Sequence, residues 1–269
     1  MTTETRIRVL IACDFAHPSD VLLSRLPQLL GVEQLDLTGL YVEDEDLLRA
    51  AELPGLSEVS AAGELVRLEI GQLRRDLTEQ ANAIRHAFEE LALRLRATHQ
   101  FVQARGRLAD EISRAAAQAD FLLISRPLRA SGLRTRAGSQ FSGVARQPVT
   151  ALLVNEPWQS GSSIVTLYPA SAPAVETALN VARRFARAEQ LPVVALVPAS
   201  QAAAARTALS DVRVVPVSDW TEDGIATACA RQDARLLVLP AQSPGEALDT
   251  SELLTRLVDR LPCSLLRLA

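Results

Sequence analysis

The stretch Ile112-Ser-Arg-Ala-Ala-Ala-Gln-Ala-Asp-Phe-Leu-Leu-Ile-Ser-Arg-Pro127 decides the fold. Its first part has an alanine-rich helical pattern, and Asp120 then leads into the apolar run Phe121–Ile124. A short apolar run without alternation is typical of a strand that is buried on both faces. A helix followed at once by such a strand indicates βαβ units, and therefore a parallel sheet covered by helices.

The same pattern returns in the second half of the chain. Ile225-Ala-Thr-Ala-Cys-Ala-Arg-Gln-Asp-Ala-Arg-Leu-Leu-Val-Leu-Pro240 begins 113 positions later (225 minus 112). A second block, Val144–Pro148, matches Val258–Pro262 at an offset of 114 (258 minus 144). Two α/β domains can resemble each other by chance, but a nearly constant offset across two blocks favours an internal duplication.

Apolar runs and helical periodicity predict the same order of elements in both halves. The first half has predicted strands at 7–13, 34–42, 101–104, 121–124 and 149–154, and helices at 18–30, 64–95, 110–118 and 139–146. The second half has predicted strands at 164–167, 193–197, 212–217, 235–239 and 263–268, and helices at 172–188, 201–209, 220–231 and 251–260. We therefore predict two doubly wound, Rossmann-like α/β domains in tandem, 1–155 and 160–269.

Two segments are predicted to lack regular secondary structure. The acidic residues Glu43–Asp46 and the chain up to Gly63 predict a solvated excursion, although such loops also serve as lids. The segment Asn155–Ser163 predicts a linker, because Pro157 and Gly161 interrupt regular structure.

Composition excludes several classes of function. All 28 basic residues are arginine, so there is no Walker A lysine, kinase lysine or Schiff-base lysine. A net charge of -4 gives no electrostatic footprint for nucleic acid, and no apolar run approaches a membrane span. The three cysteines lie in predicted core segments without metal-binding spacing, and the three histidines are isolated. No signal peptide is evident, so we expect a cytoplasmic protein with neither a nucleic-acid nor a membrane partner.

Ligands of open α/β sheets bind beyond the carboxyl ends of the strands. Asp14 follows the first predicted strand, where it is either a ligand contact or a helix N-cap. After the fourth strand comes a segment rich in small residues and arginine that leads to Gly138, Ser139 and Gln140. Free N–H groups at the start of the next helix would form a phosphate cradle, and the alternative is a helix cap in a solvated basic loop.

With these residues in view, the chain resembles a tandem member of the universal stress protein family. That family's domain has an Asp after the first strand, a small apolar residue near the end of the second, and a glycine turn after the third. An Asp before the fourth strand and a G-x2-G-x9-G-[ST] loop complete the pattern. The corresponding residues here are Asp14, Val42, Gly106, Asp120 and Gly138-Ser139.

The resemblance implies that ATP or another adenine nucleotide binds to the first domain only. The implied contacts are Asp14 and Val42 to the adenosine, with Gly138, Ser139 and Gln140 around the ribose and phosphates; no metal is implied beyond a nucleotide-associated Mg²⁺. The loop departs from the family pattern, because Ser125 and Leu128 occupy the first two glycine positions. A branched side chain there obstructs the close approach of backbone to ligand that glycine permits.

The second domain lacks the nucleotide-binding residues. Its first strand ends at Tyr168-Pro169 without an Asp, and its loop contains Glu246 and Asp249. We expect a packing role, with the closing strands 149–154 and 263–268 paired as an internal pseudo-dimer, and we leave a homodimer open. A nucleotide-blind scaffold or sensor that binds a protein partner is the alternative function. Slow ATP hydrolysis or autophosphorylation at Ser139 is the enzymatic one, for which no base is evident.

Overall fold

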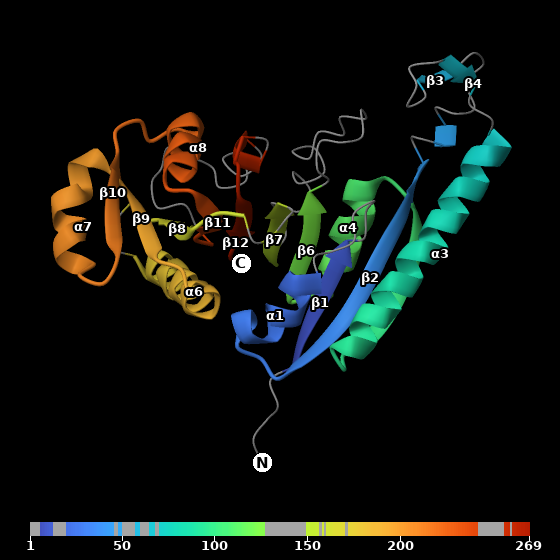
Figure 1. The fold of residues 1–269 in the computed structure, drawn as a ribbon, viewed down its shortest axis with the longest axis horizontal. Coiled ribbons are helices and arrows are strands. Elements are labelled where there is room, and N and C mark those ends of the chain that lie inside the picture. Colours follow the sequence, from blue (N-terminus) through green and yellow to red (C-terminus); the bar gives the residue numbers. More distant parts are fainter. Residues whose placement is uncertain are drawn as a thin grey trace.

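A computed structural model describes residues 6–12, 20–45, 48–49, 57–59, 65–67, 70–126, 149–155, 158, 160–169, 172–241, 256–258 and 260–269. Its main feature is one ten-stranded sheet in the order β10-β9-β8-β11-β12-β7-β6-β1-β2-β5 (Figure 1). In the first half, the described elements are β1 (Arg6–Ala12), α1 (Asp20–Leu30), β2 (Gln34–Asp44), β3 (Ser57–Val59), β4 (Leu65–Arg67), α3 (Ile70–Arg94), β5 (Thr98–Gly106), α4 (Leu108–Ala116), β6 (Phe121–Arg126) and β7 (Thr150–Asn155).

The second half repeats this alternation of strand and helix. Its elements are β8 (Ser163–Leu167), α6 (Pro173–Glu189), β9 (Val193–Pro198), the 3₁₀ turn Ala199–Gln201, α7 (Ala202–Ala208), β10 (Arg213–Val217), α8 (Glu222–Arg231), β11 (Ala234–Leu239) and β12 (Ser264–Arg267). Each half contributes five parallel strands in the same spatial order, third-second-first-fourth-fifth along the chain. The predicted α/β fold is therefore confirmed.

The two halves meet at their closing strands. β7 and β12 pair antiparallel, with Leu152 opposite Leu266, and this is the only antiparallel contact within the described part of the large sheet. The expected pairing of these strands is thus confirmed. It turns two five-stranded sheets into one continuous layer.

Helices cover the sheet from both sides, as the unbroken apolar runs predict. Successive residues of β1 show this, since Leu10 packs into one hydrophobic cluster and Ile11 into the other. Helices α4 and α8 contribute to the first cluster, while α1, α3 and α6 contribute to the second. A further cluster joins α6, α7 and β9.

The sequence prediction was wrong at two local points. The helix expected from Glu64 begins only at Ile70, because Leu65–Arg67 pairs with Ser57–Val59 as a small antiparallel ladder. Glu43 belongs to β2 rather than to a loop. The described residues of the expected linker, between β7 and β8, are neither helix nor strand, and the Trp158 side chain within it is 1% exposed and packs into the core.

Candidate functional site

The candidate site lies at the carboxyl edge of the first half of the sheet. Strands β1, β2, β5 and β6 are parallel, so their carboxyl ends meet at one edge, the upper one in Figure 1. In register, Ala12 at the end of β1 is flanked by Leu40 of β2 and Ile124 of β6. This is the edge at which an open α/β sheet binds ligands.

Val42 is the one proposed ligand contact that the structure describes. It lies near the end of β2 beside Ala104 of β5, partly buried against the hydrophobic cluster on the α4 side. An apolar side chain held there by the sheet offers a flat contact for an aromatic base. Asp14, Gly138, Ser139 and Gln140 lie outside the described residues, as does Leu128, and β1 ends two residues before Asp14.

Ser125 occupies the position at which the family pattern has its first loop glycine. It is the fifth residue of β6, lies beside Val154 of β7, and is only 4% exposed. At this position the chain is therefore part of a buried strand.

A hollow of about 200 Å³ opens at the same edge, on the side of the sheet that α3 covers. It is lined by Glu43, Leu48, Arg74, Leu77, Thr78 and Arg105. Glu43 and Arg105 are direct neighbours on β2 and β5, and Gln103 donates a hydrogen bond of 2.7 Å to Glu43 Oε1. The guanidinium groups of Arg74 and Arg105 each present several N–H donors, a group type that suits an anionic ligand group.

Sequence reasoning missed this hollow. Arg74 comes from α3 and Arg105 from β5, and only the packing of the helix against the strand brings them to one place. The signal available in the sequence was Arg105, directly after the predicted strand 101–104.

Gly106 ends β5, and its environment explains the glycine in structural terms. A Cβ at this position would lie 2.8 Å from Oε1 of Glu111, whose other oxygen accepts a 2.5 Å hydrogen bond from Arg114. The absence of a side chain thus leaves room for the carboxylate of this ion pair.

Asp120 lies at the opposite, amino edge of the sheet. Its carboxylate accepts hydrogen bonds from the Arg8 main-chain N–H at 3.0 Å and from the Arg8 guanidinium at 2.7 and 3.1 Å. The hydrogen bonds from the Arg8 side chain are the main reason that the pKa of Asp120 lies below its ordinary value. This residue of the family pattern therefore secures strand ends and lies far from the ligand edge.

The second half has a different carboxyl edge. Tyr168 follows β8, is 4% exposed, and donates a 2.9 Å hydrogen bond to Glu176. At the end of β12, the Arg267 guanidinium donates a 2.6 Å hydrogen bond to the Val149 carbonyl, and burial lowers the pKa of Arg267. Glu246 and Asp249 lie outside the described residues.

Other chemistry finds little support in the described parts of the chain. No group of three His, Cys, Asp or Glu side chains there could hold a metal ion, and no helix there has the length and apolar character to cross a membrane. Cys229 and Cys263 are buried free thiols. A hydrogen bond with Cys263, together with burial, raises the pKa of Cys229, which disfavours a reactive thiolate.

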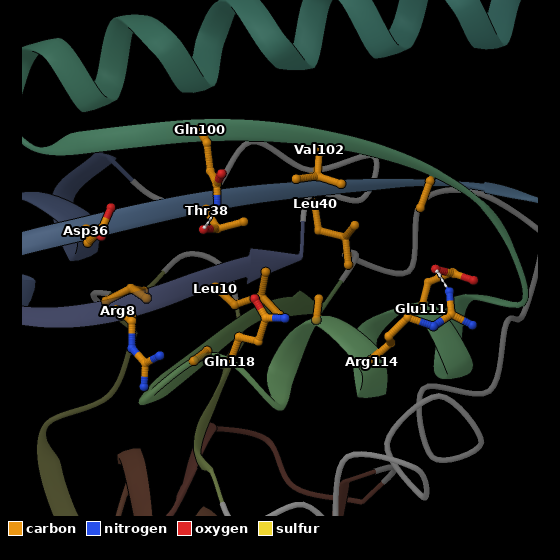
Figure 2. Close-up of a pocket in the computed structure, with 14 residues that line it drawn as sticks. Arg8, Leu10, Asp36, Thr38, Leu40, Gln100, Val102, Glu111, Arg114 and Gln118 are labelled. Atoms are coloured by element: carbon orange, nitrogen blue, oxygen red, sulfur yellow. Dashed lines mark hydrogen bonds and ion pairs between the residues drawn. The ribbon is translucent and has the colours of Figure 1, made fainter.

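A second hollow, of about 340 Å³, lies on the α4 side of the sheet and extends from Arg8 near the amino edge to Ala104, the neighbour of Val42 (Figure 2). Leu10, Leu40 and Val102 form part of its apolar floor. Gln100 of β5, which also lines the hollow, donates a 3.0 Å hydrogen bond to its register neighbour Thr38 of β2.

Solved structures share this fold. A universal stress protein from Archaeoglobus fulgidus DSM 4304 superposes with a TM-score of 0.63 at 13% identity, over 97% of this chain and 96% of that one. A functionally unknown protein from Pseudomonas aeruginosa PAO1 gives 0.57 at 15% identity, over 97% and 92%. A protein from Pseudomonas aeruginosa UCBPP-PA14, provisionally assigned to the universal stress proteins, gives 0.58 at 16% identity, over 99% and 93%.

No protein-family model matches the sequence, and no curated protein matches it either. At identities of 13 to 16%, the solved structures show that the chain has the universal stress protein fold along nearly its whole length.

Proposed function

We propose that this chain is a cytoplasmic stress-response protein of the universal stress protein type that binds ATP or another adenine nucleotide in its first half. The observation that carries the proposal is the carboxyl edge shared by the parallel strands β1, β2 and β6, near which the Val42 side chain is only partly buried. In the sequence Asp14 follows β1, and Gly138-Ser139 follow β6, so the family pattern assigns the sugar and phosphates of a base resting on Val42 to these residues.

The hollow beside α3 supports an anionic ligand. Arg74 and Arg105 provide guanidinium groups, which bind phosphate oxygens with directed hydrogen bonds. Glu43 is held by Gln103, so its carboxylate is already engaged. These guanidinium groups fit a phosphate by hydrogen-bonding type, on the face of the sheet opposite to Val42.

Thermal unfolding of the full chain with ATP, ADP and AMP tests this proposal. A nucleotide at a hundred times its Kd should raise the free energy of unfolding by about 2.7 kcal/mol. Asp14→Asn should remove most of this stabilisation. Asp120→Asn is the matched control, because Asp120 lies at the opposite edge and should leave the nucleotide effect unchanged. If millimolar nucleotide does not stabilise the wild-type protein, the proposal fails.

The second candidate is a nucleotide-blind scaffold that acts through a protein partner. The buried Ser125 favours it, because a residue at the family's first glycine position is here committed to strand β6. Ultraviolet absorbance and mass spectrometry of protein purified without added ligand separate the two candidates. A co-purifying nucleotide excludes the scaffold, whereas its absence together with a flat thermal response supports it.

A further inference from the structure

The large sheet ends in two outer strands of different character. β10 has five residues and contains Pro216, which has no N–H to offer to a neighbour. β5 has nine residues, no proline, and a register with β2 that runs without a bulge. Within the described part of the chain, β5 pairs with β2 alone. Its outer edge therefore presents an uninterrupted row of backbone donors and acceptors.

β5 also lacks the usual protection of an edge strand. Natural sheets cover or charge such edges, often with lysine, and this chain contains no lysine. Arg105, near its end, is the only Asp, Glu, Lys or Arg side chain of β5. In the middle lies Val102, 40% exposed, which is one of two large apolar side chains exposed in the described residues.

The neighbouring side chains hold this edge in place. On the α3 side, the Arg85 guanidinium lies over the Phe101 ring, 5.4 Å from its centroid, and donates a 3.3 Å hydrogen bond to Gln103. On the other side, Gln100 and Val102 line the hollow beside α4 (Figure 2). An edge that is ordered before association loses less conformational entropy when a partner binds.

We propose that β5 is the contact of a homodimer, in which β5 of a second copy adds antiparallel with a twofold axis at Val102. In this register Val102 meets Val102 of the second copy, and the two exposed side chains bury each other. Gln100 lies opposite Ala104, Phe101 opposite Gln103, and His99 opposite Arg105. No Asp, Glu, Lys or Arg side chain of β5 meets a like-charged one in this register, so the strand is complementary to itself.

A second copy fits this edge better than an unrelated segment for two reasons. The register places β-branched Val102 against itself, a favourable cross-strand pair, and needs no sequence from elsewhere. The chain also joins its own halves by antiparallel addition of one strand edge to another, β7 to β12. The dimer would extend the same layer to twenty strands, leaving the Pro216-containing β10 as the outer edge at both ends. This proposal does not depend on nucleotide binding.

The test measures the molar mass of the full chain by light scattering and sedimentation over a range of concentrations. Wild type should be a dimer. Val102→Glu and Val102→Arg should each be monomeric, because two like charges would meet at the axis. Mixed in equal amounts, the two variants should form a heterodimer, since residue 102 then faces the opposite charge.

Leu93→Glu is the matched control. Leu93 is the other exposed apolar side chain, 68% exposed on α3, and its substitution should leave the dimer intact. Circular dichroism should show wild-type folding for all three variants. A monomeric wild type, or a dimer that tolerates Val102→Glu, overturns the proposal. Failure of the Glu and Arg variants to associate with each other also overturns it, because the twofold register requires that pairing.

Discussion

At the amino edges of the two halves, equivalent strands are held by different kinds of ion pair. In the first half, Arg8 of β1 and Asp120 beside β6 form a bidentate ion pair, with side chains 58% and 41% exposed. In the second half, Arg235 of β11 donates hydrogen bonds to the Gly161 carbonyl and to Glu189 at the end of α6. The side chains of Arg235 and Glu189 are 13% and 1% exposed.

This difference shows that equal topology does not require equal energetics. An exposed ion pair contributes little, because water solvates both partners and salt screens them. A buried pair contributes little net stability when intact, yet removing one partner leaves the other charge buried without a counter-charge or water. The second half should therefore be far more sensitive than the first to a substitution at its amino edge.

The largest effect is expected from Glu189→Ala. It removes the carboxylate from Arg235 and leaves a mostly buried guanidinium without a counter-charge, which should lower the free energy of unfolding by about 3 kcal/mol. Arg25→Ala is the control. Arg25 pairs with the other oxygen of Glu189 at 3.1 Å, without an aligned hydrogen bond, and is 41% exposed. Its removal should cost below about 1 kcal/mol in urea unfolding. Equal costs for the two variants would contradict the distinction between buried and exposed pairs.

A smaller effect is expected from Gly161→Ala at the same edge. Gly161 has φ +96°, and an added Cβ would lie 2.6 Å from the Arg235 backbone nitrogen. Left-handed strain and a backbone contact together should cost about 2 kcal/mol in urea unfolding. Gly71→Ala is the matched substitution in α3, where a Cβ meets nothing within 4 Å, and it should not destabilise the protein. A Gly161→Ala protein as stable as Gly71→Ala would show that this edge can relax.

Much of the fold could be predicted from the sequence, because residues such as Leu10 and Ile11 report burial on both faces of a strand. The alternation of such runs with helical patterns then allows few topologies. Local features were missed where context decides. Leu65–Arg67 is too short for its periodicity to separate a strand from the first turn of a helix, and Trp158 is buried by the packing of the two halves around a segment whose composition is that of a linker.

The candidate site was harder to predict, because its residues come from separate elements. Val42 could be placed at the end of a predicted strand, and it does lie near the carboxyl end of β2. The arginine-lined hollow depends on α3 lying against β5, which no local spacing encodes. Asp120 belongs to the family pattern, yet its carboxylate is hydrogen-bonded to Arg8 at the amino edge, away from the candidate site.

The smallest effect is expected from Asp120→Asn, and this variant tests the comparison of the two amino edges most directly. The hydrogen bonds from Arg8 hold the pKa of Asp120 below its ordinary value of about 3.9. The stability that the Asp120 carboxylate contributes is therefore fully present above about pH 3.9, and it is lost as the pH falls through the lowered pKa. Because both side chains are largely exposed, Asp120→Asn should cost below about 1 kcal/mol at about pH 7, and the cost should shrink towards pH 3. Urea unfolding at several pH values measures both quantities.

Asp233→Asn is the counterpart in the second half, where the residue has φ +47° and its carbonyl, not its side chain, accepts a 2.7 Å hydrogen bond from Ser162. Asparagine tolerates this left-handed backbone, so Asp233→Asn should leave the free energy of unfolding unchanged at about pH 7. A cost at Asp233, or none at Asp120, would mean that the two amino edges are not secured in the different ways that their hydrogen bonds indicate.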